Sequence, residues 1–127
     1  MKDIALFGAG GFGKEVALMI QRMIKAGADW NFIGFFDDGK EVGLEISHFG
    51  KVLGDIKTLN SWPEQLAVGI AVGNTKYLPA IREGITNDNI LFPNLIDPGA
   101  YITDPESFKI GEGNIIQQVG CKVFGGS

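Results

Sequence analysis

Runs of apolar residues alternate with segments of helical spacing along the first part of the chain. Four apolar runs have the length of buried strands, at about 4–7, 32–36, 67–72 and 90–95. Between the first two runs, apolar residues recur at three- and four-residue steps from Val16 to Ile24, which predicts an amphipathic helix. Strands that alternate with helices predict an α/β fold, with a mostly parallel sheet and helices on both faces.

The segment between residues 40 and 84 is less regular but still interpretable. Residues 42–46 and 50–54 have the character of two short extended pieces. Asp55 is a good N-cap for a helix that Pro63 ends or restarts. A further helix is expected from residues 73–75 to about residue 84.

Four glycines lie directly after the first apolar run. Gly8, Gly10 and Gly13 have the spacing G-x-G-x-x-G, and Gly11 is an additional glycine. In a βαβ unit this turn is tight, lets the backbone approach a phosphate, and aims the helix N-terminus at the anion. We therefore expect Gly8, Gly10, Gly11, Phe12 and Gly13 to bind a nucleotide phosphate. The alternative is a glycine-rich turn that binds nothing.

Polar residues follow the second and third runs. Asp37 and Asp38 stand where a dinucleotide fold places the acid that binds a ribose hydroxyl, and Asp37 is favoured because it is nearer the strand end. The alternative is that this pair belongs to an ordinary Asp-Gly turn. Gly73 and Asn74 form a second strand-to-helix junction, expected at the same sheet edge. Asn74 or Thr75 either caps the helix or contacts the ligand, and capping is favoured.

Composition narrows the classes of function. The 127 residues carry a net charge of −4, which does not suggest a nucleic acid or an anionic membrane as partner. The one cysteine, Cys121, excludes a disulfide within the chain, and no signal peptide or apolar span is evident, so we expect a cytoplasmic protein. The one histidine, His48, lacks a neighbouring base or nucleophile and is interpreted as structural or solvent-facing. No residue spacing predicts a metal site.

The character of the chain changes after about residue 97. Short apolar pieces separated by glycine and asparagine replace the helical pattern. Ile110 and Ile116 are six positions apart, and Ile110-Gly111 has the form of a hexapeptide-repeat start. We therefore divide the chain into residues 1–97 and residues 98–127.

Several segments together carry a family resemblance that spans nearly the whole chain. They are GAGGFGKEV at 8–16, GFFDD at 34–38, VLGD at 52–55, IAVGN at 70–74, FPNLIDPGA at 92–100 and IGEGNII at 110–116. In this order they resemble the N-terminal part of the sialic acid O-acetyltransferase and bacterial UDP-amino-sugar N-acetyltransferase family (NeuD/PglD-like), left-handed β-helix acyltransferases of surface glycan (polysaccharide) biosynthesis.

The resemblance implies two modules. Residues 1–97 would form a Rossmann-like domain that binds a nucleotide sugar, such as a UDP-amino-sugar, or CMP-sialic acid or sialic acid. The glycine loop would then lie near the phosphates and the pair Asp37–Asp38 near the nucleoside. Residues 98–127 would begin a left-handed parallel β-helix, incomplete here.

The resemblance also implies acetyl-CoA as the co-substrate of the complete enzyme and a histidine of the β-helix as the general base. Residues 98–127 contain no histidine, so we expect this chain to bind the acceptor without acetylating it and to hold no cofactor. A homotrimer is expected if the β-helix is complete, and otherwise a monomer or self-association through residues 98–127. Two alternatives stay open: an NAD-binding oxidoreductase or NAD-sensing domain, and a non-catalytic nucleotide-binding regulatory module.

Overall fold

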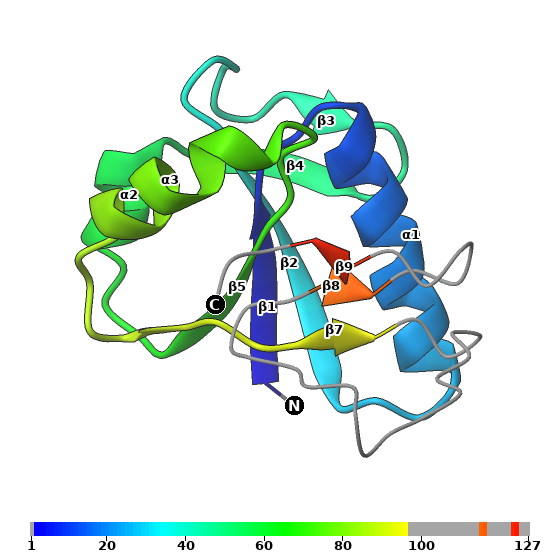
Figure 1. Ribbon diagram of the computed structural model, residues 1–127. Coiled ribbons are helices and arrows are strands. Elements are labelled where there is room, and N and C mark those ends of the chain that lie inside the picture. Colours follow the sequence, from blue (N-terminus) through cyan, green and yellow to red (C-terminus); the bar gives the residue numbers. More distant parts are fainter. Residues whose placement is uncertain (1, 97–114, 117–122, 125–127) are drawn as a thin grey trace.

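A six-stranded sheet forms the centre of the molecule in the computed structural model, which describes residues 2–96, 115–116 and 123–124 (Figure 1). The strand order is β3-β4-β2-β1-β5-β6. The strands are β1 (Lys2–Phe7), β2 (Trp30–Phe36), β3 (Glu45–Ile46), β4 (Gly50–Gly54), β5 (Leu66–Ile70) and β6 (Ile90–Leu91). Neighbouring strands pair in parallel except β3 and β4, which are antiparallel. The predicted α/β fold with a mostly parallel sheet is confirmed.

The central strand β1 is buried on both faces. Ile4 and Leu6 face one cluster of buried side chains and Ala5 and Phe7 face the other, as the two-residue period of a strand requires. Helix α1 (Gly11–Lys25) covers the first face through its apolar stripe, which includes Val16. Helices α2 (Ile56–Asn60) and α3 (Leu78–Gly84) cover the second face, on the opposite side of the sheet from α1 (Figure 1).

Polar side chains hold the two short helices α2 and α3 in place. Asp55 is the N-cap of α2, as predicted, and its Oδ1 accepts a hydrogen bond from the Thr58 backbone N–H at 3.1 Å. That backbone hydrogen bond is the largest cause that lowers the pKa of Asp55. The Asn60 side chain links α2 to the end of α3, donating to the Gly84 carbonyl at 2.9 Å and accepting from the Thr86 N–H at 2.8 Å. The bonds to the Thr58 N–H and the Gly84 carbonyl satisfy backbone groups that helix ends leave without intrahelical partners.

The expected strand at 90–95 is wrong as a single element. Residues Ile90–Leu91 form β6 at the edge of the main sheet, whereas β7 (Leu95–Ile96) belongs to a second, three-stranded sheet. Pro93 lies between them and cannot donate a ladder hydrogen bond. The helix expected to end near residue 84 begins as a 3-10 turn (Thr75–Tyr77), and α3 follows with a proline in its first turn.

The second sheet has the order β7-β8-β9, with β8 (Ile115–Ile116) and β9 (Val123–Phe124). Strand β7 pairs with β8 in parallel, and β8 pairs with β9 antiparallel. Successive coils of a parallel β-helix pair in parallel, so the β8–β9 pairing is of another kind. Most residues of the predicted β-helix, and Cys121, lie outside the described residues. The domain boundary after residue 97 and the β-helix therefore stay predictions.

Within the described part of the chain, no helix has the length and apolar character needed to cross a membrane. The expected cytoplasmic location stays a prediction.

Candidate functional site

The carboxyl ends of the parallel strands meet at one edge of the sheet. The Gly8 N–H donates to the Phe36 carbonyl at 2.8 Å, and the Ala71 N–H donates to the Phe7 carbonyl at 2.8 Å. The Asp37 N–H in turn donates to the Gly54 carbonyl at 2.9 Å. The loops that follow β1, β2, β4 and β5 are thus held side by side, and α1, α2 and α3 all begin at this carboxyl edge. Ligands of open α/β sheets bind at such an edge.

Two glycines of the loop are required by packing. Gly8 has φ +116°, and a β-carbon there would collide with the Ala71 carbonyl oxygen. A β-carbon on Gly13 would collide with the Gly8 carbonyl oxygen. Gly8 thereby lets the loop lie against the end of β5, and Gly13 lets α1 lie close to the end of β1. These are the roles that the spacing predicts for its first and third glycines.

The other two glycines have open space around them. A β-carbon on Gly10 or Gly11 would have no atom within 4 Å, and both residues are exposed. Gly10 is the N-cap of the 15-residue helix α1, which has no side-chain cap and no acidic residue in its first turn. Nothing within the described fold requires glycine at these two positions. Their small size matters only for something that approaches the helix N-terminus from outside.

Asp37 links the end of β2 to the glycine loop. Its Oδ2 accepts a hydrogen bond from the Ala9 N–H at 2.9 Å, and its Oδ1 accepts one from the Gly39 N–H at 2.8 Å. The hydrogen bond from the Gly39 N–H closes the Asp-Gly turn, which is the alternative to a ligand contact in the sequence analysis. The role of Ala9 could not be predicted from the sequence, because a backbone donor leaves no signal in residue type.

Asp38 caps a helix. Its Oδ1 accepts a hydrogen bond from the Ile56 N–H at 2.8 Å, so it satisfies a backbone group in the first turn of α2 together with the N-cap Asp55. Asp38 is exposed at the carboxyl edge. The predicted acidic pair therefore lies at the predicted edge, and each of its two members binds backbone N–H groups.

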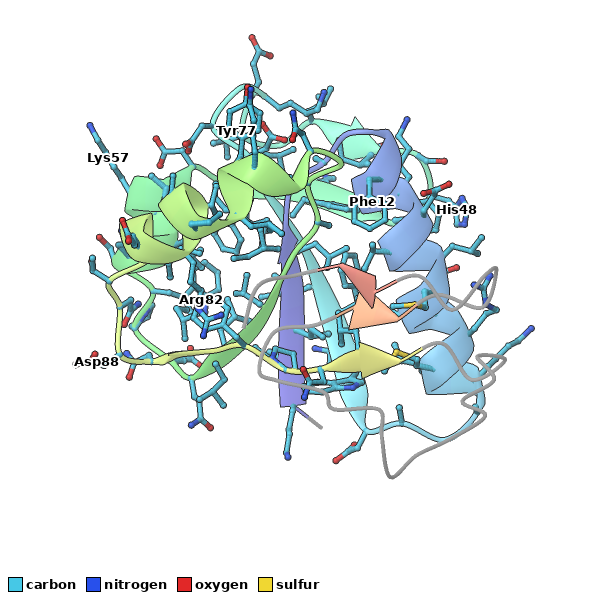
Figure 2. The ribbon with its side chains drawn as sticks, viewed as in Figure 1. Phe12, His48, Lys57, Tyr77, Arg82 and Asp88 are labelled. Atoms are coloured by element: carbon cyan, nitrogen blue, oxygen red, sulfur yellow. The ribbon has the colours of Figure 1, made fainter. Side chains whose placement is uncertain are left out.

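The loop after β5 adds exposed polar and aromatic groups. Asn74 Oδ1 accepts a hydrogen bond from the Lys76 N–H at 3.1 Å, in agreement with the favoured capping interpretation. Gly73 lies next to the glycine loop, because a β-carbon on it would stand 4.0 Å from the Phe12 Cβ. Figure 2 shows Phe12 and Tyr77 toward the end of the molecule where β1 ends. Tyr77 is 53% exposed at this edge. It is not among the predicted site residues, although it follows the strand-to-helix glycine Gly73 by only four positions.

His48 lies in the turn between β3 and β4, at the other end of β4 from Asp55. It is exposed, its ring packs on Phe49 with centroids 4.2 Å apart, and its Nδ1 lies 3.4 Å from the Ser47 Oγ. Among the described residues, no group of three or more His, Cys, Asp or Glu side chains could hold a metal ion.

A hollow of about 630 Å³ opens at the opposite, amino edge of the sheet. It lies where β1, β2, β5 and β6 begin. Its described lining includes Lys2, Asp3, Trp30, Leu66, Leu91 and Phe92. None of the predicted site residues lines it. This hollow and the predicted site are thus at different ends of the sheet.

The segment that forms the main sheet and its carboxyl edge matches a known protein family. The family model described as the PglD N-terminal domain matches residues 3–86. The chain belongs to the PglD N-terminal domain family. The matched segment includes every predicted site residue, from Gly8 to Asn74. The sequence matches no curated protein.

Solved structures give the same result for this PglD-family chain. The acetyltransferase domain of PglB from Neisseria gonorrhoeae FA1090, in complex with acetyl coenzyme A, is 33% identical, with a TM-score of 0.71 over 90% of this chain and 52% of that one. A second structure of the same domain is 32% identical, with a TM-score of 0.71 over 91% of this chain and 53% of that one. The chain thus spans about half the length of these structures. The resemblance to PglD-like acetyltransferases is confirmed, and the chain corresponds to their N-terminal region.

Proposed function

We propose that this chain binds a nucleotide sugar at the carboxyl edge of its sheet, as the acceptor-binding part of an acetyl-CoA-dependent sugar acetyltransferase of surface glycan biosynthesis. The glycine loop receives the phosphates, and the residues around it, including Phe12, Asp38, Gly73 and Asn74, flank the nucleoside and sugar. The substrate class is the one that the family resemblance implies, and the match to the PglD N-terminal domain supports the family itself.

The open environment of Gly10 and Gly11 is the observation that carries the proposal. Both glycines are exposed at the N-terminus of α1, and neither is required by packing. A phosphate at this end of the helix would be stabilised by backbone N–H groups, such as those of Gly10 and Gly11, and by the positive end of the helix dipole. The N-cap Gly10 makes no side-chain cap and the first turn has no acidic residue, so no carboxylate of this turn competes with an anion from outside.

Acetyl transfer is proposed for the family's complete enzyme and not for a polypeptide of residues 1–127. The family resemblance implies that a histidine of the β-helix draws the proton from the attacking amine or hydroxyl. The one histidine of this chain, His48, is exposed and contacts Ser47 and Phe49. We therefore expect binding of the acceptor without transfer, and trimer formation only where the β-helix is complete.

Calorimetric titration of the purified chain with UDP, CMP, NADH and CoA in parallel tests the proposal. The expected result is saturable binding of UDP or CMP and none of CoA. Tight binding of NADH alone would favour the NAD-binding alternative, and binding of none of the four would overturn the proposed function.

Two variants make the titration specific for the loop. Gly11→Ala adds a methyl group to open space, so the fold is retained and nucleotide affinity is expected to fall about tenfold, or about 1.4 kcal/mol. Lys25→Ala, at the far end of the same helix, is the control and is expected to bind as the unchanged chain does. Equal affinities of the two variants would contradict the placement of the phosphates.

A further inference from the structure

The carboxylate of Asp37 lies between two loops. Its Oδ2 is 2.9 Å from the Ala9 nitrogen in the glycine loop, and its Oδ1 is 2.8 Å from the Gly39 nitrogen. Asp37 itself is half-buried, and its own N–H donates to the Gly54 carbonyl. The side chain of Asp37 therefore connects the loop after β1 with the loop after β2, and its backbone N–H ties the same residue to the end of β4.

The bond to Ala9 has no substitute from solvent. Ala9 is only 1% exposed, whereas Gly39 is exposed and its N–H can bind water. A buried backbone N–H without a partner is costly, and a hydrogen bond to an ionised carboxylate is about twice as strong as a neutral one. Asp37 therefore fixes the backbone of the residue that lies between Gly8 and Gly10.

We infer that Asp37 is a positioning residue for the glycine loop, and that nucleotide recognition here does not depend on a contact between Asp37 and the ribose. This inference rests on the proposed function. In a dinucleotide fold, the acid at this position hydrogen-bonds the ribose 2′-hydroxyl. Here each oxygen already faces a backbone N–H of its own protein. The chain should accept nucleotides with and without a 2′-hydroxyl.

Amide hydrogen exchange of Ala9, measured by NMR without ligand, tests the positioning role. Asp37→Ala is expected to speed Ala9 exchange at least about tenfold, since the amide loses its acceptor. Asp37→Asn is expected to stay within about threefold of the original rate, because its Oδ1 can still accept from Ala9 while water serves Gly39. Asp3→Ala, at the amino edge, removes the same charge and should leave Ala9 unchanged. Fast exchange of Ala9 in the unchanged chain would overturn the inference without any variant.

Affinities for UDP and 2′-deoxy-UDP test the recognition part. The unchanged chain is expected to bind the two within about threefold, and Asp37→Ala to weaken both by the same factor of about ten. Asp37→Asn should restore most of the affinity. A clear preference for UDP that disappears in Asp37→Ala would overturn the inference and make Asp37 a ribose ligand. If the unchanged chain binds neither nucleotide, the proposed function fails, and Ala9 exchange still decides whether Asp37 positions the loop.

Discussion

The two edges of the central sheet differ in what they offer a ligand. The carboxyl edge has the glycine loop, the N-terminus of α1 and the loops that carry Asp37 and Asn74. The amino edge has the hollow of about 630 Å³, lined in part by Trp30, Leu66 and Leu91. The amino edge therefore offers a partly apolar hollow, and the carboxyl edge offers backbone donors at a helix N-terminus.

This difference means that the two edges suit different kinds of ligand. A nucleotide brings two or more negative charges that need N–H donors and a positive potential. Helix α1 points its N-terminus at the carboxyl edge and the negative end of its dipole away from it. For an anionic ligand, the electrostatics of the backbone decide in favour of the carboxyl edge.

At the carboxyl edge, substitution of Gly13 is expected to have the largest effect on stability and on nucleotide affinity. In Gly13→Ala the new β-carbon meets the Gly8 carbonyl oxygen, so α1 and β1 must move apart. Overpacking of this kind costs about 1–3 kcal/mol of unfolding free energy. Nucleotide affinity should fall with it, because the loop moves too. Urea unfolding and calorimetric titration measure the two effects.

Gly11→Ala, the same substitution two residues earlier, separates packing from binding. Its β-carbon meets no atom, so the unfolding free energy should change by less than about 0.5 kcal/mol. Only the affinity should fall, by the factor of about ten already expected from the titration. A destabilisation as large as that of Gly13→Ala would show that Gly11 is needed for the fold, and the argument from its open environment would fail.

Substitution of the N-cap of α2, Asp55, is expected to have a smaller effect on stability, and this effect depends on pH. The Thr58 N–H, with the other hydrogen bonds to the cap, lowers the pKa of Asp55 below 3.8. A carboxyl group with a lowered folded-state pKa stabilises the fold above its unfolded pKa, and this contribution is lost as the pH falls through the folded-state value. Asp55→Asn keeps the capping acceptor without the charge. Its stability should therefore be below that of the unchanged chain at pH 7 and approach it below about pH 4 in urea unfolding. A difference that does not depend on pH would contradict the assignment.

The smallest effect is expected at the amino edge. Leu91 is 48% exposed and lines the hollow. Leu91→Ser should change the unfolding free energy by less than about 0.5 kcal/mol and leave nucleotide affinity unchanged. A loss of affinity in this variant, with stability retained, would move the site to the hollow.

The sheet was predictable from the sequence because its strands are buried on both faces. Runs such as 4–7 and 32–36 are apolar at every position, and they became β1 and β2. The same criterion failed at 90–95, where Pro93 and the polar Asn94 divide the run between two sheets. Apolar composition predicts burial, but the strand partner depends on where the chain turns.

The site was predictable in position and less so in the roles of its residues. Spacing placed the glycines and Asp37 at one edge, since parallel strands bring their carboxyl ends together. Spacing could not show that Asp37 accepts a hydrogen bond from Ala9, 28 positions away, because that depends on how the two loops lie in space. It also could not separate the glycines required by packing from Gly10 and Gly11, because all four are the same residue type.

Mapping of UDP on the isotope-labelled chain by amide chemical shifts tests the central claim most directly. We expect the largest shifts at the carboxyl edge, in Gly10, Gly11 and Phe12 and in the neighbouring Gly73 and Asn74. The amide chemical shifts of residues that line the hollow, such as Trp30 and Leu91, should not change. Shifts that gather at the hollow, with the glycine loop unchanged, would contradict the account.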